Sequence, residues 1–345
     1  MSSLQKQIFR KSRLAPLESV LEDDAASESS QSSRRSFCDE AKYLPSSWHD
    51  CFDTFVDVKM NSMEDVFRVY LSNIDHADTV FAVHHGAGHS GLSFALLSKH
   101  IKELSGGRCG VVALDCRGHG DTVTKDALDI SLDRLSDDFA NVVGYILQDT
   151  PRNIILVGHS MGGAVIVDVA RRKRLENVIG VVVLDVVEGS ALDSLPSMNQ
   201  FLSTVPKQFN SVPAAIKWSV KCSTLKNLNS AKISIPPIIK PSQEDESKWV
   251  WRVDLAKTEA FWQNWYTGLS EKFLSCTGAK LLILAGTDRL DKTLMIGQMQ
   301  GKFQLNVFPE AGHFLHEDVP EHTAETLISF WERNQRLVLP PKVRS

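Results

Sequence analysis

The stretch "NIILVGHSMGGAVIVDVA", residues 153–170, decides the fold that this sequence predicts. An apolar run typical of a buried strand leads through the pentapeptide GHSMG at 158–162 into a run with helical spacing. A G-x-S-x-G pentapeptide between a strand and a helix is typical of a tight turn that holds the serine hydroxyl at the top of a sheet. Only small residues fit two positions before and after the serine, which explains Gly158 and Gly162. Ser160 is therefore a candidate nucleophile.

Strand-like and helix-like runs alternate on both sides of this stretch. Two strands joined by the turn "NSMED" are expected first, and the further strands and helices are predicted at 79–85, 92–104, 109–115, 134–149, 178–186, 279–288, 303–308 and 322–334. Strands that are apolar throughout and alternate with helices predict a mostly parallel central sheet flanked by helices. The alternation stops at about 190–270, where the sequence is helical and loop-rich. This outline predicts an α/β-hydrolase fold with a helical lid insertion.

The domain organisation follows from the same pattern. Residues 1–42 are rich in serine and charge, so we expect a disordered tail. Residues 43–335 form the predicted α/β-hydrolase domain, with the lid at about 190–270, and 336–345 form a C-terminal tail.

Composition excludes several classes of function. The chain has 345 residues, 43% of them hydrophobic, and a net charge of −4 that gives no reason to expect nucleic acid as a partner. Its longest apolar stretch, 178–184, is too short to span a membrane. The six cysteines contain no C-x-x-C pair, so the usual zinc and redox spacings are missing. We therefore expect no metal, and a cytoplasmic and/or nuclear location.

A serine nucleophile needs a base, and the base needs an orienting acid, in the chain order Ser, acid, His for this fold. His313 in "NVFPEAGHFLHE" follows the last strand and is the expected base. His316 is the alternative base, although it is expected to begin or cap the final helix. Asp185 and Asp288 each end a predicted strand, and the pattern does not choose between them. Glu188 and Asp291 are further options for the acid.

The stretch "VFAVHHGAGHSGLSF", residues 80–94, allows two interpretations. Its G-x-G-x-x-G pattern can hold a dinucleotide, with Asp115 as the ribose ligand. However, this loop follows the third strand-like run instead of opening the sheet, and a lone glycine pattern is a weak signal. In a hydrolase the same loop supplies one oxyanion donor, and the residue after the serine supplies the other. We expect these donors to be the amides of Ala87, with Gly88 as second choice, and Met161.

Several runs carry a closer resemblance. The segments "GHSMGGAVIVDVA", "LDVVEGSALDSLPSMNQFL" and "AGTDRLDKTLMIGQMQGKFQLNVFPEAGHFLHEDVP" resemble the protein phosphatase methylesterase family over roughly residues 43–335, lid included. The resemblance implies a serine carboxylesterase that needs no cofactor. It also implies that the partner and substrate is the catalytic subunit of type 2A protein phosphatase, whose C-terminal leucine methyl ester is hydrolysed. The implied roles are Ser160 as nucleophile, Asp185 as acid and His313 as base.

The chain departs from that family pattern at two places. Ala87 stands where a glycine is expected in the oxyanion loop, and its amide can still donate if its φ is negative. Only "QEDES" remains where relatives carry a long acidic insertion, which puts regulation through that insertion in doubt.

The predicted lid concentrates aromatic residues. Phe201, Trp218 and Trp251 are the candidates for substrate binding, and the alternative is that they pack the lid onto the core. Two other functions fit the same sequence: a general small-ester hydrolase, and an inhibitory phosphatase-binding protein on a hydrolase fold.

Overall fold

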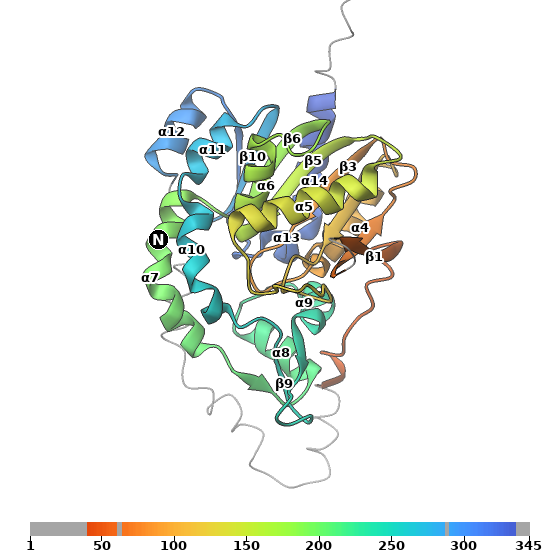
Figure 1. Ribbon diagram of the computed structural model, residues 1–345, viewed down its shortest axis with the longest axis vertical. Coiled ribbons are helices and arrows are strands. Elements are labelled where there is room, and N and C mark those ends of the chain that lie inside the picture. The colour runs from red at the N-terminus through yellow and green to blue at the C-terminus, as the bar shows by residue number, and fades with distance from the viewer. Residues whose placement is uncertain (1–39, 61–63, 287–289, 336–345) are drawn as a thin grey trace, which may run out of the picture.

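An eight-stranded sheet runs through the molecule in this computed structural model, which describes residues 40–60, 64–286 and 290–335 (Figure 1). Its strands lie in the order β1 (Thr54–Met60), β2 (Asp65–Ser72), β4 (Cys109–Leu114), β3 (Thr79–His84), β5 (Asn153–His159), β6 (Val178–Leu184), β10 (Ala279–Ala285) and β11 (Gln304–Phe308). Strand β2 is antiparallel to both β1 and β4, and all the other neighbours are parallel.

The central strands explain why the sequence runs are apolar throughout. Every residue of β3 and β4 is buried, because helices cover both faces of the sheet there. The edge strands β1 and β11 are more exposed. The predicted mostly parallel α/β sheet is therefore confirmed, while most of the predicted turn "NSMED" lies outside the described residues.

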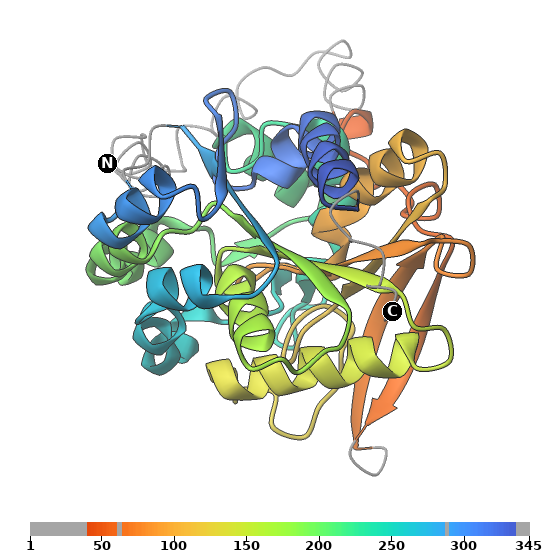
Figure 2. The same cartoon turned by 90° about the horizontal axis from the view of Figure 1, so that it is seen from above.

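Helices pack on the two faces of the sheet, as Figure 2 shows. One face carries α4 (Ala95–Leu104), preceded by the short η3 (Gly91–Phe94), and α14 (Pro320–Gln335). The other carries α5 (Leu132–Leu147), α6 (Met161–Arg171), α11 (Leu269–Ser275) and α12 (Lys292–Met299). A four-residue helix, α13 (Leu315–Asp318), precedes α14. Two separate apolar clusters, one on each face, form the core.

The insertion is more than helices and loops. It contains α7 (Glu188–Thr204), α8 (Val212–Lys221), α9 (Leu228–Ser234), η4 (Pro236–Ile238), η5 (Leu255–Thr258) and α10 (Glu259–Tyr266). It also contains a three-stranded antiparallel sheet in the order β7 (Gln208–Phe209), β9 (Trp249–Trp251), β8 (Ile239–Pro241). Strands of two or three residues are too short to show alternation, so the sequence pattern missed this sheet.

One side chain fastens the two ends of the insertion together. Glu188, the first residue of α7, accepts the Gly268 amide at 2.7 Å with Oε1 and the Ser270 amide at 2.9 Å with Oε2. Gly268 and Ser270 stand at the start of α11, where the chain returns to the core. The carboxylate thus satisfies amides that a helix N-terminus leaves without partners.

The predicted tails fall almost entirely outside the described residues. Residues 40–42, assigned to the disordered tail, begin with a helical turn in which the Tyr43 amide donates to the Glu40 carbonyl at 2.9 Å. Within the described ranges, no helix has the length and hydropathy needed to cross a membrane.

Candidate active site

The serine turn lies between β5 and α6. Ser160 has φ 53° and ψ −118°, which is strained for a residue that carries a side chain. Its amide donates to the Leu184 carbonyl at 3.0 Å and ties the turn to β6. A Cβ atom on Gly158 would collide with the Gly162 carbonyl, and one on Gly162 would collide with the His84 carbonyl. The available space therefore requires both glycines, which is the physical reason for the pentapeptide.

Asp185 and His313 meet beside this turn. Asp185 follows β6, and His313 lies in the loop between β11 and α13. The His313 Nδ1 atom is 2.7 Å from Asp185 Oδ2, and both side chains are buried. Because a carboxylate only accepts, Nδ1 carries the proton and Nε2 remains as the basic nitrogen. The Ala285 amide holds the second carboxylate oxygen, Oδ1, at 2.7 Å.

The backbone of His313 is attached to the serine turn. His159, which precedes the serine, donates from its ring Nε2 to the His313 carbonyl at 2.8 Å. Ser160, Asp185 and His313 all line one cavity. The three residues that the sequence analysis proposed therefore lie around one cavity.

The side chain of Asp318 also holds the loop that carries His313. Asp318 accepts the Gly312 amide at 2.7 Å with one oxygen and the Lys226 amide of the insertion at 2.7 Å with the other. Burial raises the pKa of Asp318, against the lowering effect of these two amides. Asp318 therefore connects the base loop to the lid.

The alternative residues are occupied elsewhere or lie outside the described ranges. His316 is in α13, not in the final helix, and its ring stacks on Phe94 with centroids 4.5 Å apart. It packs behind His159 and does not itself line the cavity. Glu188 caps α11, and Asp291 caps α12 by accepting the Leu294 amide at 2.9 Å. Asp288 lies outside the described residues.

The predicted oxyanion loop packs against the serine. A Cβ atom built on Gly86 would lie 3.3 Å from the Ser160 Cβ. The Gly88 amide, the second choice of donor, already donates to His119 Nε2 at 2.9 Å. The amides of Ala87 and Met161, by contrast, have no acceptor within the part of the chain that the structure describes. This leaves Ala87 as the better candidate of the two loop residues.

The dinucleotide interpretation does not survive. Asp115 is fully buried, and its carboxylate accepts the Gly91 amide at 2.7 Å and the Asp121 amide at 2.8 Å. Both oxygens are therefore engaged by the backbone, and Asp115 shapes two loops as the hydrolase interpretation expects.

A cavity of about 860 Å³ opens beside Ser160 and is largely apolar. Helices α7 and α10 and strand β9 of the insertion form much of its wall, and Phe201, Trp218 and Trp251 all line it. The Trp251 ring lies 5.9 Å from that of Trp218, and its Nε1 donates to the Pro206 carbonyl at 2.7 Å. These side chains both pack within the lid and face the cavity.

Two residues near the reacting groups were not proposed from the sequence. The Tyr266 hydroxyl interacts with the Ser160 side chain, and burial raises the pKa of Tyr266 to about 12, so it stays protonated. Tyr266 was one aromatic among many in the lid, and nothing in the sequence singled it out. The other is His119, whose contact with Gly88 joins loops that are 31 residues apart. In the described ranges, no group of three metal-ligating side chains has the geometry of a metal site.

Comparisons with known proteins agree with this geometry. The family model "Alpha/beta hydrolase family" matches residues 80–326. Protein phosphatase methylesterase 1 of Emericella nidulans is 46% identical over 84% of this chain and 77% of its own length. The Schizosaccharomyces pombe protein of the same name is 43% identical over 86% of this chain and 88% of its own length.

Solved structures support the fold alone. E-2-(acetamidomethylene)succinate hydrolase superposes with a TM-score of 0.63 at 19% identity, covering 81% of this chain and 100% of the other. An esterase of Mycobacterium tuberculosis superposes with a TM-score of 0.61 at 18% identity, covering 81% and 92% of the two chains.

Proposed function

We infer the function of this chain from one premise, that it belongs to the protein phosphatase methylesterase family of α/β hydrolases. It is accordingly a carboxylic ester hydrolase. We propose that its substrate is the methyl ester on the C-terminal leucine of the catalytic subunit of type 2A protein phosphatase. The observation that carries this proposal is the 43–46% identity to methylesterases over more than four fifths of the chain.

The proposed reaction is two-step acyl transfer. Ser160 attacks the ester carbonyl while His313 Nε2 takes the hydroxyl proton, and Asp185 stabilises the imidazolium that forms. The protonated His313 then gives its proton to the leaving methoxide, and methanol departs. Water activated by His313 attacks the acyl-enzyme and releases the leucine carboxylate. The 2.7 Å contact between His313 and Asp185 supports these roles.

The negative charge of the tetrahedral intermediate needs hydrogen-bond donors that are already in place. The amides of Ala87 and Met161 are the proposed donors, one from the loop after β3 and one from the first residue of α6. Their lack of other acceptors within the described residues supports this choice. The N-terminus of α6 adds a favourable partial positive charge beside the oxyanion.

The cavity supports an extended peptide end as substrate. Its volume of about 860 Å³ is far larger than one leucyl methyl ester requires. The apolar wall from α7, α10 and β9 suits apolar side chains that precede the ester. Phe201, Trp218 and Trp251 are the proposed contacts of that segment.

We also propose a cytoplasmic and/or nuclear location. Four buried cysteines, Cys51, Cys109, Cys116 and Cys276, carry thiols, and burial raises the pKa of each. Buried thiols of this kind persist in a reducing compartment.

The deciding experiment measures methanol release from the carboxymethylated phosphatase catalytic subunit. We expect Ser160→Ala to lower the rate at least about 1,000-fold, because the nucleophile is removed. Ser136→Ala is the control, since Ser136 is a buried serine of α5 that does not line the cavity. Wild-type rates from Ser160→Ala would overturn the mechanism. Absent methyl release with rapid turnover of a short chromogenic ester would overturn only the phosphatase substrate.

A further inference from the structure

The amide of Gly88 is held by a buried histidine from another loop. His119 Nε2 lies 2.9 Å from the Gly88 nitrogen, and His119 Nδ1 lies 2.8 Å from the Arg117 carbonyl. A carbonyl only accepts, so Nδ1 carries the proton and Nε2 is the acceptor for Gly88. Only the neutral, Nδ1-protonated tautomer makes both bonds. Burial lowers the pKa of His119 to about 4, which keeps the ring neutral near pH 7.

The neighbouring peptide is held in the same way. The Gly86 carbonyl accepts from His85 Nδ1 at 2.8 Å and from the His89 amide at 3.2 Å. Because a peptide group is planar, fixing the Gly86 carbonyl fixes the direction of the Ala87 amide on the opposite side of that plane. His119 fixes the next peptide, between Ala87 and Gly88. The two backbone units that flank the Ala87 Cα are thus both anchored by imidazole rings.

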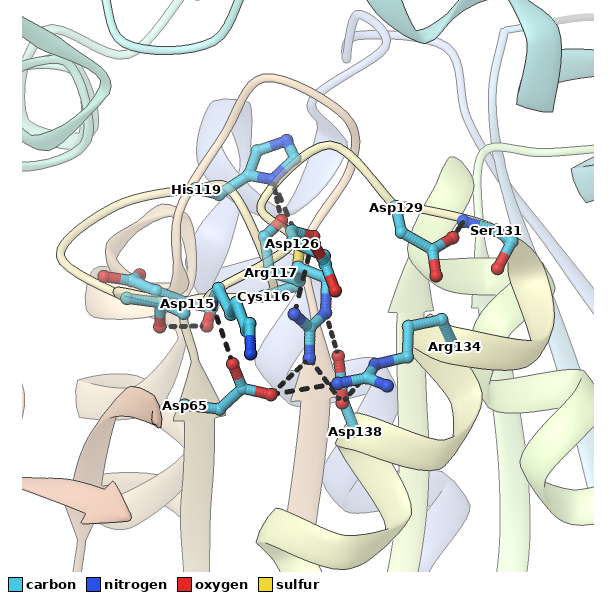
Figure 3. A network of polar contacts seen from close by, with 12 residues as sticks. Asp65, Asp115, Cys116, Arg117, His119, Asp126, Asp129, Ser131, Arg134 and Asp138 are labelled. Atoms are coloured by element: carbon cyan, nitrogen blue, oxygen red, sulfur yellow. Dashed lines mark hydrogen bonds and ion pairs between the residues drawn. The ribbon is translucent and has the colours of Figure 1, made fainter. Parts of the chain in front are cut away.

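The anchor of His119 is itself rigid. Figure 3 shows His119 above Arg117, whose guanidinium reaches down to two carboxylates. Arg117 is 0% exposed and pairs with Asp138 at 2.7 Å and with Asp65 at 2.9 Å. Arg134 lies 2.9 Å from Asp65 and 3.3 Å from Asp138, which closes the network. Breaking a buried ion pair of this kind is strongly unfavourable, so the Arg117 carbonyl is a fixed point for the ring.

We propose that His119 is a positioning residue for the oxyanion hole. By accepting the Gly88 amide it fixes the peptide that follows Ala87. Together with the anchored Gly86 carbonyl, this bond holds the torsions at the Ala87 Cα and keeps the Ala87 amide aimed at the substrate oxygen. His119 does so without touching the substrate. Because the Gly88 amide already donates to His119, it does not compete with the Ala87 amide for the oxyanion. This inference rests on the proposed role of Ala87 and assigns the device that orients it.

The test compares two amide substitutions that differ in reach. In His119→Gln the side-chain oxygen extends to the place of Nε2 and accepts the Gly88 amide. In His119→Asn the shorter amide reaches the Arg117 carbonyl but not Gly88. We expect His119→Asn to lower kcat about 10- to 100-fold with little change in KM, because an oxyanion donor is misaimed. We expect His119→Gln to stay within about 3-fold of wild type.

A second readout reports on the oxyanion directly. A trifluoromethyl ketone that forms a tetrahedral adduct with the serine should lose affinity in His119→Asn by the same factor as kcat/KM. Phe330→Leu is the control, since Phe330 is a ring of α14 that is equally buried but lies outside the cavity lining. It should leave kcat and inhibitor affinity within about 3-fold of wild type. Thermal melting of each variant separates lost folding from lost turnover per folded molecule.

All variants are assayed on a short chromogenic ester, so the result does not depend on the phosphatase. Wild-type kcat in folded His119→Asn, or an equal loss in His119→Gln and His119→Asn, would overturn the positioning role. A loss in Phe330→Leu equal to that in His119→Asn would also overturn it. Failure of the mechanism itself is recognised separately, by ester turnover that survives in Ser160→Ala.

Discussion

Asp185 has a backbone conformation as unusual as that of the serine, with φ 51°. It stands directly after β6, and the Ala285 amide of the next strand binds one of its oxygens at 2.7 Å. That amide and the ring of His313 together fix the carboxylate in one orientation. A neutral amide in its place could hold the ring only in the wrong tautomer.

We therefore expect Asp185→Asn to lower kcat about 1,000- to 10,000-fold while the protein stays folded. Asp288→Asn is the matched control, because Asp288 comes after β10, the neighbour of β6 in the sheet, and was the rival acid. It should keep wild-type kcat. Steady-state kinetics on the short ester, with circular dichroism on each variant, makes the comparison. Equal activity of the two variants, or the reverse order, would contradict the assignment.

At the level of single residues, the sequence predicts some members of the candidate site more firmly than others. Ser160 is marked by the two glycines that the turn requires, and His313 by its place after the last strand. The acid was ambiguous, because Asp185 and Asp288 follow β6 and β10, which are adjacent parallel strands ending at the same edge of the sheet. His119 could not be found at all, since its contact depends on how two loops meet in space.

Among the elements, β9 is one of those through which the lid lines the cavity. Val250 and Trp251 line the cavity, whereas Trp249 packs only against the apolar cluster of the insertion. Trp251 also contacts Phe209 of β7, with ring centroids 5.3 Å apart. The strand therefore combines a packing role with a surface for the substrate.

Trp251→Ala is expected to raise KM for the methylated phosphatase about 10-fold, equivalent to about 1.4 kcal/mol of lost binding. Its kcat on a short ester should stay within about 3-fold of wild type, because Ser160, Asp185 and His313 lie on the core. Trp249→Ala is the control: it should destabilise the protein without raising KM. Equal KM effects from the two variants would show that general loosening of the lid, and not a contact, is responsible.

The position of this insertion could be predicted from the sequence, but its small sheet could not. A break in the strand-helix alternation predicted where it begins and ends, and the helices α7, α8 and α10 have recognisable patterns. The short strands β7, β8 and β9 form only because tertiary contacts bring them together. Local propensity over two or three residues is too weak to predict such pairs.

For the molecule as a whole, an unusual number of histidines are buried in the neutral form. Burial is the largest cause of a lowered pKa at each of them: His84, His85, His89, His119, His159 and His316. Several of these rings accept or donate hydrogen bonds in loops around the cavity. Their protonation is therefore linked to the stability of the whole fold.

We expect the protein to lose stability as the pH falls from 7 to 5. Each folded-state histidine pKa lies below the unfolded value of 6.5, so the unfolded chain takes up protons first. The stabilisation is complete above pH 6.5 and is lost as the pH falls toward 4. For His84 and His119, whose pKa is about 4, the loss at pH 5 is about 2 kcal/mol each.

Two buried carboxyl groups act in the opposite direction. Burial raises the pKa of Asp115 to about 7 and that of Glu317 to about 8. The folded protein therefore takes up these two protons before the unfolded chain does, and their contribution to the stability of the fold grows as the pH falls. They offset only part of the loss from six histidines. Urea unfolding at pH 7, 6 and 5 measures the net effect, and His316→Leu should show a shallower pH dependence. A free energy of unfolding that stays constant across this range would refute the linkage.

The grip of Glu188 on both ends of the insertion has a consequence for how such enzymes diversify. The chain leaves the core at Glu188 and returns to it at Gly268 and Ser270, which Glu188 binds. The insertion is therefore a loop whose two ends are held together. Lengthening a closed loop raises the free-energy cost of closing it only slowly, by about 0.6 kcal/mol per doubling of its length. Segments such as residues 243–247 can therefore grow or shrink without straining the sheet. The lid that contacts the substrate can therefore change in length and sequence while Ser160, Asp185 and His313 keep their positions on the core.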